Sequence, residues 1–396
     1  MKQIEVDVLV IGAGPAGSMA AREASRNGAK TLIIDKKAEI GTPKRCAEGI
    51  TDGVLEKLDI HVDKRCIARS IDGARIVSPN GTSAWFTSET LDTPATGIVL
   101  ERKVFDKHLT MDAIRAGCKV FLRCEALSMT KTDEGYDVKV KSLINEVDEI
   151  KAKIVIGADG PEGRVASWGG LDTKVSLAEM EAGAQYEMTN LNMEKNDVIQ
   201  FYFGSVAPGG YAWIFPKGYD IANVGIDISN VKTDKTALEC LDEFIANCEE
   251  TKNAQAVELN VGGNPYCGVF DKIIADNLLL VGDAAGCVNP ITGGGIDTAL
   301  ESGVIAGRVA ARCVKENDCS ENNLKEYSDY IEDNIAKKFR KYISIRDFLY
   351  NLEDDDLDEY INALATSDIK TLSTKTLLKA LIKVSPRKLL KLRKLL

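Results

Sequence analysis

Short apolar runs that end on glycine recur along the chain. Residues 6–11, 154–156 and 278–281 are rich in Val, Ile and Leu, and each runs directly into a glycine. Such runs are typical of parallel strands that are buried on both faces, and residues 31–35 (TLIID) form another. None of these runs approaches the roughly 20 residues that a membrane span needs. The pattern therefore predicts an α/β fold with a buried parallel sheet.

The middle and the end of the chain follow different patterns. The segments EAGAQYEM, DVIQFYFG, YAWIFP and IANVGIDI, between residues 181 and 228, predict strands of a second sheet. Residues 320–396 are polar and repeat their apolar positions at helical spacing. We therefore expect a second, sheet-based unit in the middle of the chain and a helical region at its end.

Composition excludes several classes of protein. The 396 residues carry a net charge of −10, which argues against a nucleic-acid binder. The N-terminal MKQIEVDVLVIG enters a strand with no signal peptide before it, which predicts a cytoplasmic protein. The ten cysteines include no CxxC pair, and only two histidines occur, so we expect no metal site.

The first apolar run opens a nucleotide-binding pattern. Gly12, Gly14 and Gly17 have GxGxxG spacing between the strand and a helical segment. Gly12 permits a tight turn, Gly14 lets the backbone approach a pyrophosphate, and Gly17 lets helix and strand pack closely. Asp35, at the end of the next strand, can accept hydrogen bonds from ribose hydroxyls. The pattern predicts a dinucleotide site and leaves FAD and NAD open.

Two later glycine clusters narrow this choice. ADG at 158–160 and GDAA at 282–285 each follow a strand, and three glycines at 293–295 precede a helix. Together with the N-terminal GxGxxG, they resemble the FAD-dependent family that has the fold of para-hydroxybenzoate hydroxylase. RCAEG at 45–49 and YAWIFP at 211–216 further resemble the geranylgeranyl reductase family and its archaeal digeranylgeranylglycerophospholipid reductases.

The resemblance implies FAD as the cofactor and a reductase that hydrogenates the double bonds of geranylgeranyl chains in phospholipid biosynthesis. It implies a Rossmann-like FAD-binding domain made of residues 1–70, 101–165 and 270–320. An antiparallel-sheet substrate domain takes 71–100 and 166–269, and a C-terminal helical region takes 321–396. Around FAD, beside the three glycines of GxGxxG, the resemblance places Ala16, Asp35, Cys46, Ala47, Gly49, Arg102, Ala126, Asp283, Gly295 and Ile296.

The aromatic strand YAWIFP is predicted to serve the substrate. Alternation places Tyr211, Trp213 and Phe215 on one face, which suits the wall of an isoprenoid channel and equally a strand that faces a core. Aromatic faces would stabilise positive charge that develops on an alkene carbon. Tyr211 and Trp213 are therefore candidate catalytic residues. The proton donor is left open among Cys46, Tyr211 and a bound water.

Other functions remain as alternatives. A flavin monooxygenase or halogenase would share the fold, although IDGARIVSPN at 71–80 lacks the lysine that a halogenase needs. An electron carrier on this fold would add an iron–sulfur module, for which no cysteine spacing exists. We find no second nucleotide motif, so a reduced ferredoxin or an F420-type donor is as suitable as NAD(P)H.

The basic end of the chain is a candidate membrane contact. After Asp368 no acid occurs, and TKTLLKALIKVSPRKLLKLRKLL is dense in Lys, Arg and Leu. On an acidic protein this reversal of sign suggests peripheral binding at the inner face of an anionic membrane. The alternative is an amphipathic helix packed on the protein with its lysines in solvent.

Overall fold

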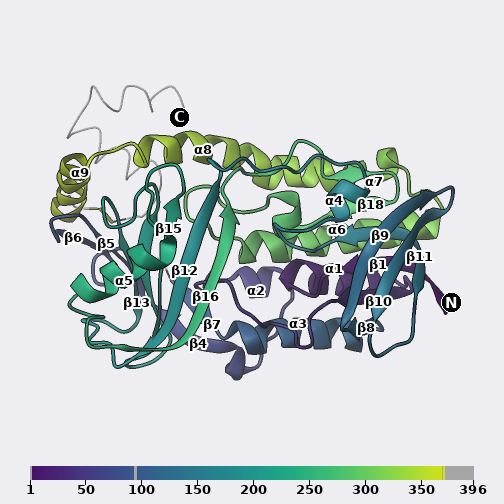
Figure 1. Ribbon diagram of the computed structural model, residues 1–396, viewed down its shortest axis with the longest axis horizontal. Coiled ribbons are helices and arrows are strands. Elements are labelled where there is room, and N and C mark those ends of the chain that lie inside the picture. The colour runs from purple at the N-terminus through teal and green to yellow at the C-terminus, as the bar shows by residue number, and fades with distance from the viewer. Residues whose placement is uncertain (1, 93–95, 368, 371–396) are drawn as a thin grey trace.

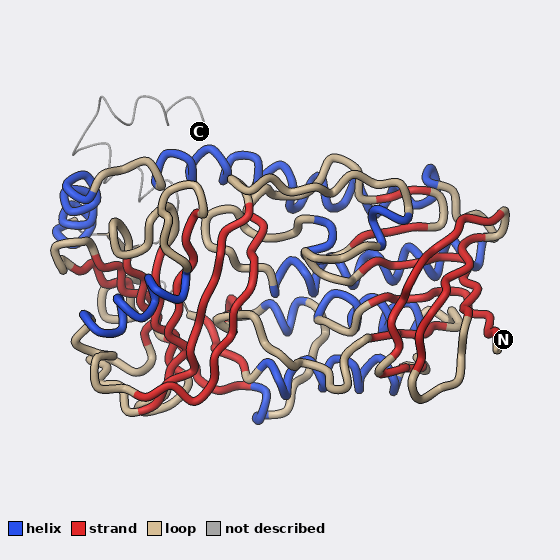
Figure 2. Tube along the Cα trace, in the orientation of Figure 1, coloured by secondary structure: helices blue, strands red, loops and turns tan. Residues whose placement is uncertain are grey.

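The computed structural model describes residues 2–92, 96–367 and 369–370. Two groups of strands lie at opposite ends of the long axis, and helices α7, α8 and α9 follow one long edge from one end to the other (Figure 1). Figure 2 shows the same division, with strands at both ends of the molecule. Helices run lengthwise beside the group of strands that contains the N-terminus.

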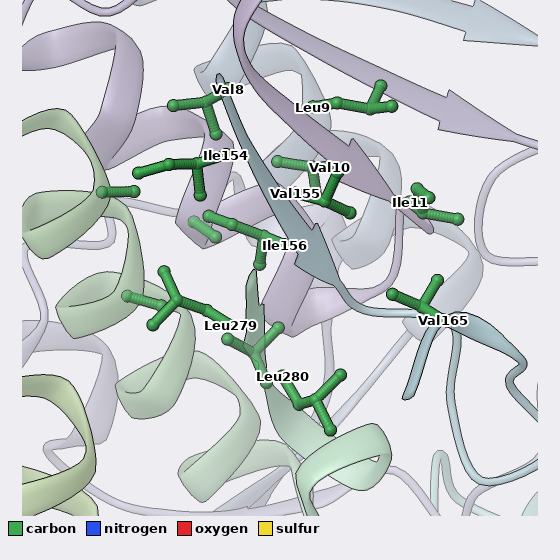
Figure 3. Packing of buried hydrophobic residues seen from close by; sticks show 14 of the residues in the cluster. Val8, Leu9, Val10, Ile11, Ile154, Val155, Ile156, Val165, Leu279 and Leu280 are labelled. Atoms are coloured by element: carbon green, nitrogen blue, oxygen red, sulfur yellow. The ribbon is translucent and has the colours of Figure 1, made fainter. Parts of the chain in front are cut away.

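The first sheet is the predicted buried parallel sheet. Strands β1, β2, β8, β11 and β18 run parallel in the order β18-β11-β1-β2-β8, and β9 and β10 form an antiparallel extension on β11. Side chains of β1, β11 and β18 pack together in its centre (Figure 3). The strands of this sheet are β1 (Gln3–Ile11), β2 (Thr31–Asp35), β8 (Lys119–Leu122), β9 (Cys124–Thr132), β10 (Gly135–Ser142), β11 (Glu149–Gly157), β17 (Ile274–Ala275) and β18 (Leu278–Leu280).

Two helices stack in layers on this sheet. α6 lies against α1, and β-carbons at Gly303 and Gly307 would lie 2.2 Å from the backbone oxygens of Ala16 and Ala20. The glycines thus let the two helices approach at backbone distance. The helices are α1 (Pro15–Arg26), α2 (Val54–Lys57), α3 (Arg102–Arg115), α4 (Val165–Trp168), α5 (Ala237–Asn247), α6 (Ile296–Glu316), α7 (Glu321–Ile331), α8 (Lys337–Leu349) and α9 (Asp354–Thr366), with short 3-10 turns η1 (Lys64–Cys66) and η2 (Gly282–Ala285) and a π turn η3 (Glu332–Ala336).

The second sheet has one apolar face, and its opposite face carries both aromatic and polar side chains. Its order is β16-β12-β15-β14-β13-β5-β6, antiparallel except for the parallel pair β5 and β13. α5 begins with a capping box between Thr236 and Glu239 and packs on the apolar face through Leu241 and Phe244. The strands are β5 (Gly73–Val77), β6 (Ser83–Phe86), β12 (Met180–Thr189), β13 (Val198–Tyr202), β14 (Tyr211–Pro216), β15 (Ala222–Ser229) and β16 (Gln255–Pro265).

A small third sheet brings the RCAEG turn against the second sheet. It consists of β3 (Gly49–Thr51), β7 (Gly97–Leu100) and β4 (Ile67–Ile71) in the order β3-β7-β4. Ile71 and Val99 pack against the rings of β14. The predicted α/β class, with a Rossmann-like unit, an inserted and mainly antiparallel sheet and C-terminal helices, is confirmed. The exact domain boundaries stay a prediction.

Candidate active site

The glycine turn between β1 and α1 forms a cradle of backbone. A β-carbon at Gly12 would lie 2.2 Å from the Ala158 oxygen, and one at Gly17 would lie 2.0 Å from the Gly12 oxygen. A β-carbon at Gly14 would meet no atom within 4 Å. Gly12 and Gly17 therefore serve close packing, whereas Gly14 leaves open space at the N-terminus of α1. Backbone N–H groups at such a position fit the pyrophosphate of FAD.

Asp35 closes this turn from the end of β2. Its carboxylate is buried and accepts hydrogen bonds from the Ala13 N–H at 2.9 Å and from the Lys37 N–H at 2.8 Å. It therefore holds the glycine turn in position. Its predicted contact with a ribose stays a prediction, as does the contact of Ala126, which lies on β9 and packs against the core of the first sheet.

Arg102, Cys46 and Asp283 come from three distant segments, and the Arg102 guanidinium lies close enough to interact with both of the other side chains. The Arg102 guanidinium forms a bidentate pair with Asp106 at 2.7 and 2.8 Å. Burial raises the pKa of Asp283, and the Arg102 charge opposes this shift. A β-carbon at Gly295 would lie 3.2 Å from the Asp283 carboxylate.

Other predicted cofactor residues adjoin this group. Ile296 begins α6 and shares an apolar cluster with Cys46. A β-carbon at Gly282, beside Asp283, would lie 2.9 Å from the side chain of Ala16. The structure thus gathers Ala16, Cys46, Arg102, Asp283, Gly295 and Ile296 around one region, while their contacts with FAD stay predictions.

The RCAEG turn is fixed from the second sheet. The Gln185 amide donates to the Cys46 carbonyl at 3.0 Å, and the Trp213 indole N–H donates to Gln185 at 3.1 Å. Burial raises the pKa of the Cys46 thiol, which therefore stays protonated at neutral pH. Ala47 packs with the aromatic rings, and a β-carbon at Gly49 would lie 2.7 Å from the Phe215 ring.

The three rings of β14 share one face, as the alternation predicts. Tyr211, Trp213 and Phe215 are buried in one cluster, whereas Ala212 and Ile214 face α5. The Tyr211 and Trp213 ring centroids lie 5.6 Å apart. The Tyr211 hydroxyl donates to the carbonyl of Thr292, directly before the three glycines of the α6 loop. The strand therefore joins the RCAEG turn to that loop, and its predicted role toward substrate stays a prediction.

Sequence reasoning missed a buried ionic cluster behind the RCAEG turn. Glu48 is fully buried and accepts hydrogen bonds from Lys217 at 2.7 Å and from Lys44 at 3.2 Å. The Asn223 amide donates to the same carboxylate at 2.7 Å, and the Arg102 N–H donates to its other oxygen at 2.7 Å. Burial opposes ionisation, but Lys217 and Lys44 hold the pKa of Glu48 below its usual range. The signal was present in the polar residues at alternate positions of β12 and β15.

An apolar cavity of about 730 Å³ opens beside the aromatic strand. It lies between the loop that joins β13 to β14 and the helices α8 and α9. Gly210 and Ile291, which line it, directly precede Tyr211 and Thr292 in the chain. Its wall includes Phe203, Gly209, Phe348, Leu349, Tyr350, Leu352, Leu357 and Leu364. The cavity therefore extends to the start of the aromatic strand and to the loop before α6.

Across the described ranges, no helix combines the length and the apolar character that a bilayer crossing requires. The basic tail at 385–396 lies outside the described residues, so the structure does not test its predicted membrane contact.

Comparisons with known proteins fit this geometry. A family model described as an FAD binding domain matches residues 5–337. The chain is 71% identical over 392 residues to digeranylgeranylglycerophospholipid reductase 3 of Methanosphaera stadtmanae, covering 99% of each chain. It is 42% identical over 365 residues to digeranylgeranylglycerophospholipid reductase of Methanocaldococcus jannaschii, covering 91% of each chain.

Solved structures share the fold. A geranylgeranyl bacteriochlorophyll reductase-like protein from Thermoplasma acidophilum has a TM-score of 0.93 and 37% identity, with both chains covered completely. The halogenase PltM has a TM-score of 0.71 at 16% identity, covering 98% of this chain and 85% of that one. The likeness to the halogenase shows the fold alone.

Proposed function

The chain belongs to the FAD-binding digeranylgeranylglycerophospholipid reductases, and from this premise we propose that it hydrogenates the geranylgeranyl chains of archaeal phospholipid precursors. The observation that carries the proposal is the 71% identity to a reductase of that name over 99% of both chains. The monooxygenase and halogenase alternatives rest on the shared fold, so they are not favoured.

FAD, when bound and reduced, supplies the hydride for this chemistry. The open space at Gly14 and the N-terminus of α1 would hold its pyrophosphate. The buried group around Arg102, Asp283 and Gly295 would hold the flavin end. This chain's own task is to bind the lipid, to orient one double bond, to exclude water and to deliver a proton.

The apolar cavity suits the isoprenoid chain. Its volume of about 730 Å³ falls within the range of roughly 300–1,000 Å³ that ligand pockets occupy. Its polar lining residues include Lys232 and the acids 353–355. An uncharged prenyl chain can bury its surface against the apolar wall without desolvating a charge of its own.

The function is tested anaerobically on the holoenzyme. The bound flavin is reduced with dithionite, digeranylgeranylglyceryl phosphate is added, and flavin reoxidation and product mass are followed. The expected product gains two hydrogens for each double bond. Oxygen incorporation under air without saturation would instead support a monooxygenase. Replacing dithionite by reduced ferredoxin or by reduced F420 distinguishes the two proposed electron donors.

Narrowing the cavity should weaken substrate binding. Leu352→Trp places a larger side chain in the cavity wall, outside the buried core clusters of the described residues. We expect KM for the lipid to rise roughly tenfold or more, as overfilling a packed site typically costs about 1–3 kcal/mol. Leu177→Trp is the matched control, because Leu177 is 76% exposed and is not among the residues that line the cavity. Equal KM values for both variants would place the lipid elsewhere.

We propose that the basic tail holds the enzyme at the membrane that contains its substrate. Deleting residues 385–396 removes five of its lysines and arginines. Cosedimentation with anionic liposomes should then fall several-fold, because each basic residue near such a surface contributes about 1 kcal/mol. Turnover of detergent-dispersed lipid should be retained. Unchanged liposome binding would contradict the membrane role.

A further inference from the structure

Two acids and two tyrosines meet at one end of the second sheet, on the face opposite α5. Tyr211 on β14 is paired directly across the ladder with Asp227 on β15. Gly183 on β12 is the partner of Asp227 on its other side, and Glu181 lies two residues before it. Tyr266 directly follows β16. The group is thus assembled from four adjacent strands.

Hydrogen bonds join Tyr266 and Asn264 to Asp227. The Tyr266 hydroxyl donates to the Asp227 carboxylate at 2.9 Å, and the Asn264 amide donates to the same oxygen at 3.2 Å. Tyr266 is fully buried and also interacts with the Tyr211 phenol and with the Glu181 carboxyl. The ionisable groups of Glu181, Asp227 and Tyr211 therefore all lie within interaction range of the Tyr266 hydroxyl.

The acid pair differs from the buried cluster around Glu48. In the Glu48 cluster, Lys44 and Lys217 pair directly with the carboxylate. Glu181 has no such direct ion pair among the described residues, and the cation that acts on it is Arg346. One Glu181 oxygen is buried with no hydrogen-bond partner among the described residues. Burial and the Asp227 charge raise the pKa of Glu181 to about 9, and burial raises the pKa of Asp227. The pair therefore retains a proton at neutral pH.

The path ends where substrate and cofactor are expected to meet. The Tyr211 hydroxyl already reaches Thr292, next to the glycines of the α6 loop. Tyr350 lines the apolar cavity, and its buried hydroxyl lacks a hydrogen-bond partner in the described chain. It lies close enough to interact with Glu181 and Tyr211. The acid pair is thus linked to both the cavity and the loop.

We propose that Glu181 and Asp227 store the proton consumed in alkene reduction, and that Tyr266 and Tyr211 relay it to the substrate. The inference rests on the proposed reductase function. As the π bond breaks, one carbon gains the hydride that the reduced cofactor supplies. The Tyr211 O–H bond breaks, and its proton forms the C–H bond at the other carbon. Tyr266 then reprotonates Tyr211, the acid pair reprotonates Tyr266, and water restores the pair between turnovers.

The rate of alkene reduction should depend on pH through the Glu181 and Asp227 pair and the groups that surround it. A general acid works in its protonated form, so the reduction step should slow as the pH rises through about 9. The groups that face the pair are Tyr211 on β14, Asn264 and Tyr266 on and after β16, Arg346 on α8 and Tyr350 after it.

The stored proton can be observed without turnover. Infrared difference spectra of the oxidised holoenzyme should show a protonated carboxylic acid at neutral pH that disappears at high pH. Glu181→Gln should remove this band, and Asp227→Asn should shift its titration to lower pH because a like charge is lost. Asp242→Asn, at an exposed carboxyl on α5, is the control and should change nothing. Absence of the band in the wild type would overturn the proposal.

Single-turnover kinetics then test whether the stored proton is delivered to the substrate. Glu181→Gln, Asp227→Asn and Tyr266→Phe should slow lipid-dependent flavin reoxidation by roughly 100- to 10,000-fold, the usual contribution of general acid catalysis. FAD content and reduction by dithionite should be unchanged. Tyr202→Phe, on the α5 side of the same sheet, is the matched control. Full rates in all three variants, or loss of proton delivery in Cys46→Ser alone, would overturn the relay. A wild type that leaves the lipid unsaturated would refute the reductase function itself, whatever the infrared result.

Discussion

Glu48→Ala is expected to destabilise the fold by about 3–5 kcal/mol and to lower the FAD content of the purified protein. The substitution removes the fully buried carboxylate that pairs with both Lys44 and Lys217, so that these buried lysines keep only partners that are partly exposed, Glu187 and Glu101. Removing one partner from a buried ion pair has a cost of this size. The backbone N–H of Arg102 also loses its acceptor. Urea unfolding and the flavin absorbance of the purified protein measure the two effects.

A surface pair supplies the matched control for Glu48. Glu89 is 73% exposed and pairs with Lys195 at 2.8 Å, so Glu89→Ala should cost within about 1 kcal/mol. The double variant Glu48→Gln with Lys217→Met should recover part of the loss, because it removes a positive charge together with the negative one. If Glu48→Ala were as mild as Glu89→Ala, the cluster would not stabilise the turn.

The buried ionic cluster around Glu48 predicts that the stability of the folded protein falls in acid. Because the folded-state pKa of Glu48 lies below its usual value of 4.5, the contribution of Glu48 to stability is complete above pH 4.5. This contribution is lost as the pH falls through the lower folded-state pKa.

The Glu181 carboxyl affects stability in the opposite direction. Its raised pKa means that folding is favoured at low pH and that stability declines between about 4.5 and about 9. The two buried clusters therefore respond to pH in opposite directions.

Local patterns predicted the backbone framework well. The glycine spacing located the turn before α1, and the alternation in YAWIFP predicted that Tyr211, Trp213 and Phe215 share one face. In both cases, the chemistry is confined to a few consecutive residues, so spacing alone determines the geometry.

Long-range polar contacts were not predictable in the same way. In EAGAQYEM the polar residues at alternate positions look like a solvent face, yet Glu181 and Gln185 are buried against other segments. The cavity likewise depends on segments far apart in the chain, since the Asp354 carboxylate of α9 accepts from the Ser205 N–H at 2.8 Å. A sequence shows that a face is polar, but only the fold shows which charges cover it.

Gly14→Val is expected to weaken FAD binding severely while the protein remains folded. The Gly14 backbone has φ −75° and ψ −176°, which any residue adopts, and a β-carbon there would meet no protein atom within 4 Å. The new side chain would fill the space in which the pyrophosphate approaches the backbone. Overlap of this kind should cost roughly 3 kcal/mol or more, which corresponds to about a 100-fold rise in Kd or more.

Gly17→Val, three residues along the same turn, should mainly lower the stability of the protein, whereas Gly14→Val should mainly weaken FAD binding. A β-carbon at Gly17 would lie 2.0 Å from the Gly12 carbonyl oxygen and 2.9 Å from the Ala158 side chain, so the backbone itself must move. We therefore expect a marked fall in the Tm of the apoprotein, whereas Gly14→Val should leave that Tm within a few degrees of the wild type. Thermal unfolding of flavin-free protein and titration with FAD separate the two outcomes. If Gly14→Val bound FAD normally, the open space at α1 would not hold the pyrophosphate, and the assignment of this turn to the cofactor would fail.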